Sequence, residues 1–410
     1  VIIYDDLKTT GPAPDYLNPD NEWGRVDPGA GDDLVDATGT EHGFDIRSSS
    51  GNDTIIGSEA WYETIVFDAY SSNAVVIDAP AGTLSDEFGN TDTFENIDNF
   101  RMTAGNDLIY GAHDVDATGM AGNDVFVGST GWTTVRYDQE YWDNNDGTRI
   151  EANFGPSPLY IYDTGPDGSI YATFLASYTA VDSFGNLDYF EAGEFGEYFK
   201  NIRGGFLTDD ILIGGEDYNE LRGEGGDDYI DGGVGGGSTS YMWSRDRDFL
   251  PKSGGIVANL TDYDIKTTAN GVLPSTPSAS FINDINTSYF LFEPTRYSTV
   301  ETNTIIDNYG FIDDVRNLNF LGGTGFDDII FSENLGVAGE WDLVWSSVDP
   351  GAGDDLVIGG VNPNLNPSRD ELVYNSVEYR SADDFFRYQA DWINEASPGS
   401  IPQPTGISID

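Results

Sequence analysis

Residues Thr208–Gly233 read TDDILIGGEDYNELRGEGGDDYIDGG, and this stretch decides the fold. An Asp or Asn recurs in it every nine residues, an apolar residue follows each one by two positions, and glycines separate the units. The polar residues are Asp210, Asn219 and Asp228, and the apolar ones are Leu212, Leu221 and Ile230. A short fixed period is typical of a solenoid, in which each repeat forms a backbone turn that stacks on the next.

The same phrase recurs outside this stretch. It consists of a small residue, Asn or Asp, then Asp, and then residues that alternate like a short β-strand. The further copies are GAGDDLV at Gly29–Val35, SGNDTII at Ser50–Ile56, AGNDLIY at Ala104–Tyr110, AGNDVFV at Ala121–Val127, GFDDIIF at Gly325–Phe331 and GAGDDLV at Gly351–Val357. The phrase is embedded in a longer, degenerate cycle, so the chain is predicted to be an all-β repeat protein.

The nonamers resemble the repeats-in-toxin (RTX) family, whose nonapeptide G-G-x-G-x-D-x-U-x forms a calcium-binding parallel β-helix. The resemblance covers roughly residues 27–380. It implies an all-β fold, a parallel β-helix or β-roll solenoid, here with long decorated loops. The chain departs from the family pattern because most nonamers are single or paired, and because Thr208 replaces the usual fourth-position glycine.

Three segments are expected along the chain. Residues 1–26 are an N-terminal arm, and residues 27–380 are the RTX-like β-helical domain, with insertions at about 140–197 and 262–308. Residues 381–410 are a capping helix and an extended tail. A capping-box-like start, apolar residues at helical spacing and a following proline predict a short amphipathic helix over residues 381–396, which would cover the open end of the solenoid.

The charge of the chain excludes several partner classes. The sequence has 72 Asp and Glu against 18 Lys and Arg, a formal net charge of −54. Nucleic acids and anionic membranes are therefore excluded as simple electrostatic partners. No apolar run approaches the roughly 18 residues of a membrane-spanning helix, so membrane insertion is not expected. The chain has no Cys, which excludes disulfides and thiolate chemistry, and its acidity favours bound cations.

Calcium is the cation that the repeats favour, because it takes six to eight oxygens from carboxylates and backbone carbonyls. If each coil contains two nonamers, ligands on stacked turns lie about 18 residues apart. The pairs Asp210 and Asp228, Asp107 and Asp124, and Asp33 and Asp53 are separated by 18, 17 and 20 residues. Several Ca²⁺ ions are thus expected, with the predicted ligands Asp33, Asp53, Asp107, Asp124, Asp210, Asn219, Asp228, Asp327 and Asp355.

An alternative interpretation remains open for each copy. Gly, Asn and Asp favour turns everywhere, so the phrase could simply turn the chain. The site in the GFDDIIF copy is the least regular, and there Asp327 fits the nonamer phase better than Asp328. The constant offset between the Asp and the apolar residue across the whole set favours calcium.

Catalytic signals are poor. His42 and His113 belong to no HExxH motif, and no G-x-S-x-G motif occurs, so the RTX-type protease and lipase are not supported. One insertion contains many aromatic residues, which suit either a sugar-stacking platform, a protein contact, or core filling beneath long loops. The sequence favours core filling. These residues are Tyr141, Trp142, Tyr160, Tyr162, Tyr171, Phe174 and Tyr178.

The expected function is that of a secreted, calcium-stabilised structural protein of a bacterial surface, extracellular matrix or filament, and not an enzyme. The RTX resemblance implies type I secretion and an extracellular or cell-surface location. The alternatives are an adhesin-type module that binds surface glycans and a polysaccharide-modifying enzyme. Head-to-tail self-association is a further hypothesis, because the β-prone segment Val1–Tyr4 could add as a strand to a neighbouring copy. The interpretation favoured over it is that both termini pack on their own coil.

Overall fold

The structure is a computed structural model that divides into two compact units, residues 1–208 and 209–410. It describes residues 2–4, 24–38, 43–58, 62–140, 148–164, 170–194, 196–206, 208–241, 255–260, 265–268, 271–272, 299–307, 310–324, 328–332, 347–351, 356–359 and 385–388. Within these ranges the fold is all-β, with large parallel sheets that are consistent with a β-solenoid. No helix in the described part is long and apolar enough to cross a membrane.

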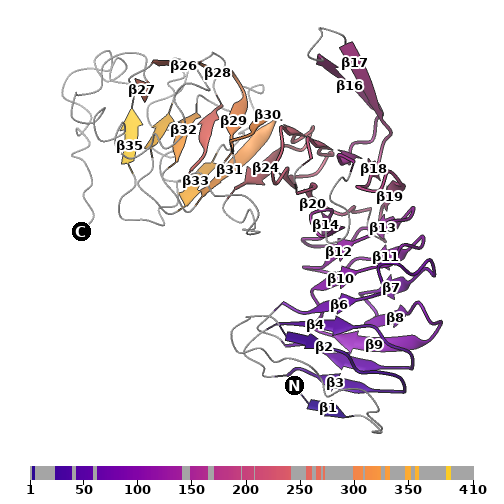
Figure 1. Ribbon diagram of the computed structural model, residues 1–410. Helices are drawn as coiled ribbons and strands as arrows, with labels where there is room; N and C mark the ends of the chain where they lie inside the picture. The colour runs from indigo at the N-terminus through magenta and orange to yellow at the C-terminus, as the bar shows by residue number, and fades with distance from the viewer. Residues whose placement is uncertain are drawn as a thin grey trace, which may run out of the picture. The chain divides into compact units, whose positions relative to one another are not determined.

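The first unit contains a long row of short strands, named sheet A (Figure 1). Among the strands described, five of the ten neighbouring pairs are parallel, as expected for stacked coils, and the other five are antiparallel. In spatial order the strands are β1 (Ile2–Tyr4), β3 (Leu34–Asp36), β5 (Thr54–Ile56), β9 (Thr91–Glu95), β8 (Thr83–Ser85), β7 (Val76–Asp78), β11 (Leu108–Tyr110), β13 (Val125–Val127), β19 (Leu187–Glu191), β18 (Thr179–Val181) and β15 (Glu151–Asn153). At one edge β1 pairs antiparallel with β3 of the same chain.

A second row of the first unit, sheet B, is parallel throughout. Its strands are β2 (Gly24–Val26), β4 (Phe44–Arg47), β6 (Thr64–Val66), β10 (Asn99–Arg101), β12 (Asp116–Thr118), β14 (Thr134–Arg136) and β20 (Asn201–Arg203). The sheets meet through their inward side chains: the rings of Phe94 on β9 and Phe100 on β10 lie edge to face, 5.1 Å apart. The core of the unit therefore lies between sheets A and B.

The second unit repeats this architecture. Its sheet A comprises β21 (Ile211–Ile213), β23 (Tyr229–Asp231), β30 (Ile312–Arg316), β29 (Thr304–Ile306), β25 (Val257–Asn259), β32 (Ile329–Ser332), β34 (Leu356–Gly359) and β35 (Phe385–Tyr388). Its sheet B comprises β22 (Asn219–Arg222), β24 (Gly237–Ser240), β31 (Leu318–Thr324) and β33 (Ser347–Gly351). Three short strands, β26 (Ile265–Thr268), β27 (Gly271–Val272) and β28 (Thr299–Val300), form small antiparallel pairings.

The apolar residue of each repeat points into this core, as the nonamer phase predicts. Leu212, Leu221 and Ile230 are all fully buried, and so are the equivalent Val35 and Ile109. Successive side chains of a strand alternate between faces, so one central residue of a three-residue strand fixes the whole strand's orientation. Burying such a side chain contributes about 1.5–3 kcal/mol, which pins each coil to its neighbour.

The parallel rows are interrupted by antiparallel strands. In sheet A, β8 lies between β7 and β9, β18 lies between β15 and β19, and β29 lies between β25 and β30, with antiparallel pairing on both sides. The predicted roll is therefore not uniformly parallel. The cause is a five-residue turn that closes β8 and β9, and likewise each of the other two pairs, into a β-hairpin.

The structure contradicts two expectations for particular segments. The helix predicted over residues 381–396 is wrong where that segment is described, because Phe385–Tyr388 form strand β35, parallel to β34. Aromatic residues favour strands, and the edge of β34 offers unpaired backbone groups. Core filling is also wrong for several insertion aromatics, namely Tyr160, Tyr162, Tyr171 and Phe174, which are exposed. Tyr141 and Trp142 lie outside the described residues.

Candidate functional site

Each recurring Asp lies where a coil turns into sheet A. Such a residue immediately precedes a three-residue strand, so its backbone N–H lies beyond the end of the regular ladder and needs another acceptor. The Asp residues at this position before β3, β5, β11, β13, β21 and β23 are Asp33, Asp53, Asp107, Asp124, Asp210 and Asp228. All six are buried.

The Asp carboxylates satisfy these N–H groups from one coil to the next. In every case Oδ1 accepts the bond, and we call the series the inner ladder. The N···Oδ1 bonds are Asp33 to Asp53 (2.8 Å), Asp53 to Asp92 (2.8 Å), Val75 to Asp107 (2.7 Å), Asp107 to Asp124 (2.8 Å), Asp124 to Asp188 (2.9 Å), Asp210 to Asp228 (2.8 Å), Asp228 to Asp313 (3.1 Å) and Ile256 to Asp328 (2.7 Å). The structure thus brings together all three pairs that spacing selected.

The residue before each Asp forms a parallel series at the surface, the outer ladder. Here too a side-chain oxygen of the phrase accepts a backbone N–H from a neighbouring coil. The bonds include Asn52 to Asp32 (2.8 Å), Thr91 to Asn52 (3.2 Å), Asn123 to Asn106 (3.0 Å), Asp227 to Asp209 (2.9 Å) and Ile312 to Asp227 (2.7 Å). The two ladders explain why the phrase needs two consecutive Asn or Asp residues even without a bound metal.

Sequence reasoning missed a second motif that completes the inner ladder. It reads D-x-[FY]-G-x-x-D, and it forms the hairpin turn before β9, β19 and β30. Its central glycine has φ between 85 and 90°, the left-handed region that glycine adopts without strain. Its last Asp is the ladder acceptor. The three copies are Asp86–Asp92, Asp182–Asp188 and Asp307–Asp313, and their common spacing of six residues was the available signal.

Some turns of the inner ladder carry a hydroxyl donor for the carboxylate. In these hydroxyl-paired turns, a Ser or Thr four residues before the Asp donates its side-chain O–H to that Asp. The bonds are Ser49 Oγ to Asp53 Oδ2 (2.9 Å), Thr103 Oγ1 to Asp107 Oδ1 (2.9 Å) and Thr324 Oγ1 to Asp328 Oδ1 (2.8 Å). The carboxylate is thereby supplied with donors from its own turn and from the neighbouring coil.

Two turns of the ladder are built differently, and we call them donorless turns. At Asp124 and Asp228, the Oδ2 atom is buried and has no hydrogen-bond partner among the described residues. The residue four positions earlier is Met120 or Glu224, each with a positive φ (63° and 71°), and carries no short hydroxyl. A glycine lies five positions earlier, and a Cβ built there would be 2.2 or 1.9 Å from Oδ2. Glycine thus leaves the space that the carboxylate occupies.

Burial and repulsion make these carboxylates costly when they are ionised. Burial raises the pKa of Asp107, in a hydroxyl-paired turn, to about 6. The pKa values of Asp124 and Asp228 are raised further, first by burial and then by the charges of Asp188 and Asp313, respectively. An isolated buried carboxylate either keeps its proton or takes a cation.

The neighbours Asp188 and Asp313 are held in the same way in the two units. Asp188 Oδ2 accepts a hydrogen bond from the Tyr137 hydroxyl at 3.0 Å, and Asp313 Oδ2 accepts one from the Tyr241 hydroxyl. Each tyrosine follows its donorless Asp by 13 residues. The donorless turn, the tyrosine and the second Asp therefore form a duplicated arrangement, once in each unit.

The donor set fits calcium in part. Hard oxygen ligands are abundant, and the donorless Oδ2 atoms of Asp124 and Asp228 are available to a cation. In the hydroxyl-paired turns each carboxylate already accepts donors on both sides. No group of three acidic or histidine side chains within the described residues is arranged to hold a metal ion. An ion at a donorless turn would therefore need backbone carbonyl oxygens for most of its coordination shell.

The remaining predicted ligands have different environments. Asn219 lies in sheet B, where its Oδ1 accepts the Gly215 N–H at 2.7 Å, so it does not belong to the inner ladder of Asp210 and Asp228. Asp327 and Asp355 lie outside the described residues. In the GFDDIIF copy, Asp328 takes the inner-ladder position, although nonamer phase favours Asp327.

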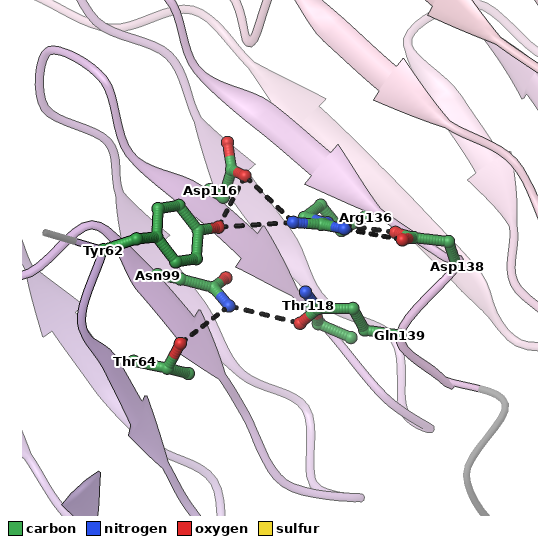
Figure 2. Close-up of polar contacts among 8 residues, drawn as sticks. All are labelled: Tyr62, Thr64, Asn99, Asp116, Thr118, Arg136, Asp138 and Gln139. Atoms are coloured by element: carbon green, nitrogen blue, oxygen red, sulfur yellow. Dashed lines mark hydrogen bonds and ion pairs between the residues drawn. The ribbon is translucent and has the colours of Figure 1, made fainter. Parts of the chain in front are cut away.

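A buried ion-pair network lies on the outer side of sheet B in the first unit (Figure 2). Arg136 on β14 is 1 % exposed and forms two parallel bonds to Asp138, with Nε···Oδ1 3.0 Å and Nη2···Oδ2 2.6 Å. Its Nη1 also lies 3.3 Å from Asp116 Oδ2, which accepts the Tyr62 hydroxyl at 2.7 Å. Gln139 accepts hydrogen bonds from two neighbouring strands, and the network holds the chain after β14 against sheet B.

Comparison with known proteins adds no relative. No protein-family model matches the chain, and no curated protein matches it.

Proposed function

We propose that this chain is a secreted, calcium-stabilised structural protein of a bacterial surface, extracellular matrix or filament, of the RTX type. The observation that carries the proposal is the pair of donorless turns. Asp124 and Asp228 each place a buried carboxylate oxygen where no described group donates to it. Nearby carboxylates increase the cost of that negative charge, and a divalent cation would offset it.

The charge of the whole chain supports the same proposal. A net charge of −54 opposes a compact state through self-repulsion, and 18 basic residues cannot neutralise 72 acidic ones. Extracellular calcium modules bind with dissociation constants on the order of 10⁻⁴–10⁻³ M, so such sites fill outside a cell and empty in the cytosol. Conditional folding of this kind suits export of an unfolded chain followed by folding at the cell surface.

A structural role follows from how the residues are used. The described repeats place their polar side chains in two backbone-satisfying ladders and their apolar side chains in a core, which is the chemistry of a scaffold. Head-to-tail assembly remains part of the proposal, but strand β1 (Ile2–Tyr4) pairs with β3 of its own chain. Its addition to a neighbouring copy would first require its release.

Circular dichroism with excess chelator and then with millimolar calcium tests the proposal. A ligand that binds only the folded state raises its stability by mass action, and several sites make the effect steep. We expect the strand signal to be lost, or the melting temperature to fall by many degrees, in chelator, and calcium to restore it. Magnesium at the same concentration is the control. An unchanged spectrum and melting temperature in chelator would refute the calcium proposal.

A further inference from the structure

The hairpin of β16 (Leu159–Thr164) and β17 (Ile170–Leu175) projects from the strands of the first unit (Figure 1). Six residue pairs join its strands, and Tyr160 lies directly opposite Phe174. Directly opposed residues share a face, so the positions of Tyr160, Tyr162, Thr164, Phe174, Ala172 and Ile170 form one face, which we call the aromatic face. Its four large side chains are between 54 and 72 % exposed.

The rings of the aromatic face are ordered against one another. Tyr160 and Tyr162 stack with centroids 6.4 Å apart and an interplanar angle of 28°. The ring centroid of Phe174 lies 5.0 Å from that of Tyr160 across the hairpin. These spacings match those of favourable aromatic pairs, which stabilise a two-stranded hairpin that would otherwise be marginal. The result is a short row of rings on a projecting support.

The base of the hairpin is clamped by buried polar contacts. Asn153 is fully buried, and its Nδ2 donates to the carbonyl oxygens of Ser157 and Ala176, both at 3.1 Å, one on each leg. On the face opposite the rings, Arg149 Nη2 donates to Thr173 Oγ1 at 2.6 Å. A support fixed in this way loses little conformational entropy when a ligand binds, which favours a recognition role.

The size and charge of the aromatic face limit the kinds of partner that it can bind. A stable protein interface needs roughly 20–30 residues a side, many more than the six positions of this face, so a second copy or another folded protein is a poor fit. A second copy would also carry the same net charge of −54. A membrane surface is disfavoured because the described hairpin residues include no Lys or Arg to pair with anionic headgroups.

We propose that the aromatic face of the β16–β17 hairpin binds an uncharged polysaccharide by stacking sugar rings on Tyr160, Tyr162 and Phe174. The face carries no charged side chain on a chain of 72 acidic residues, so an uncharged ligand can cover it without desolvating a charge. Aromatic faces contact the apolar C–H faces of pyranose rings, and tyrosine hydroxyls remain available to sugar hydroxyls. This inference goes beyond the scaffold role and does not depend on where calcium binds.

Affinity electrophoresis and pull-down on cellulose, amylose, mannan and galactan test the proposal, in constant millimolar calcium so that the protein remains folded. The wild type should be retained by at least one of these uncharged polysaccharides and not by anionic alginate. Tyr162→Ala and Phe174→Ala should each weaken binding about tenfold, the loss expected for one good ring contact. Tyr162→Phe, which keeps the ring, should retain most of the binding.

Tyr171→Ala is the matched control. Tyr171 is 59 % exposed and belongs to the same hairpin, but it alternates onto the opposite face from Ile170 and Ala172. Its replacement should leave binding unchanged. Retention by none of the four uncharged polysaccharides would overturn the proposal, and so would an equal loss in Tyr171→Ala. A Tyr162→Ala effect on sedimentation or on flotation with phosphatidylcholine vesicles, without one on polysaccharide, would assign the face to a second copy or a lipid surface instead.

Discussion

The hydroxyl-paired turn at Asp107 and the donorless turn at Asp124 are neighbours on one inner ladder, yet their carboxylates have different surroundings. Asp107 accepts the Val75 N–H, the Thr103 N–H and the Thr103 hydroxyl. Asp124 accepts the Asp107 N–H through Oδ1, while its buried Oδ2 has no partner among the described residues. The same repeat position is therefore saturated in one coil and unsaturated in the next.

This difference separates two roles of one repeated residue. In both turns Oδ1 satisfies the backbone of the adjacent coil, which accounts for the presence of Asp at every copy. Of these two kinds of turn, the donorless one leaves a carboxylate oxygen that requires a proton or a cation. The repeat is thus structural in every coil, and we propose that it binds calcium where the turn lacks the hydroxyl.

The largest expected effect on folding stability is that of pH, because several buried carboxyls titrate together. Burial raises the pKa of Asp92 and of Glu63 to about 7, and that of Asp107 to about 6. Their unfolded pKa values lie near 4, so between about pH 4 and 7 the folded state holds protons that the unfolded state has released. Stability in chelator should therefore fall as pH rises through this window.

Thermal unfolding in chelator at pH 5 and pH 8 measures the effect. The midpoint should be clearly higher at pH 5, and millimolar calcium should reduce the difference by stabilising the ionised form. A midpoint that is equal or higher at pH 8 in chelator would show that the buried carboxyls do not keep their protons.

A smaller effect is expected from Asp107→Asn in the hydroxyl-paired turn. The amide oxygen can still accept the Val75 N–H, but the new NH₂ then faces the Thr103 N–H, which is also a donor. The loss of stability should be about 2 kcal/mol, as for a buried donor without an acceptor. Urea unfolding should give the same loss with and without calcium. A loss that appears only in calcium would place an ion at this turn.

The smallest effect is expected from Thr103→Val, which removes one hydroxyl and keeps the shape of the side chain. Asp107 loses the Thr103 Oγ1 donor and keeps both backbone donors, and the Gly105 N–H loses Thr103 Oγ1 as its acceptor. Stability should fall by about 1 kcal/mol, and Thr103→Ser, which restores the hydroxyl, should recover it. If Thr103→Val instead increased the calcium response, the missing hydroxyl alone would be sufficient to create a donorless turn.

Spacing predicted the inner ladder only where coils are short. Asp210 and Asp228 are 18 residues apart and directly bonded, because uninterrupted coils stack at a constant chain length. Where an excursion separates the coils, the ladder partner of Asp124 is Asp188, 64 residues away, and that of Asp228 is Asp313, 85 residues away. A nine-residue period cannot find such partners, but the D-x-[FY]-G-x-x-D motif marks them.

Local sequence patterns were misleading where the same residues are compatible with two different structures. Phe385–Tyr388 fit a helical spacing, yet they form a strand beside the free edge of β34, because pairing depends on a neighbour that the local sequence does not contain. The hairpin aromatics were predicted to fill the core, yet they are exposed. Alternation along the strands places Tyr171 on one face of the hairpin and the other rings on the opposite face, and only the tertiary structure shows that no layer of described residues covers them.

Asp228→Asn distinguishes a calcium ligand from a purely structural residue, because calcium binding at Asp228 predicts changes in stability of opposite sign with and without the ion. Asparagine keeps an oxygen for the Asp210 N–H and cannot ionise, so it avoids the free-energy cost that burial and the charge of Asp313 impose on the Asp228 carboxyl. In chelator at pH 7.5 the variant should therefore be more stable than the wild type. In millimolar calcium it should be less stable, because the carboxylate ligand is lost. Asp124→Asn should repeat both signs in the first unit.

The measurement is the unfolding midpoint of wild type and Asp228→Asn, each in chelator and in millimolar calcium. We expect the order of stability of the two proteins to reverse between these conditions. The same order in both conditions would contradict this expectation, because Asp228 would then be a purely structural member of the inner ladder.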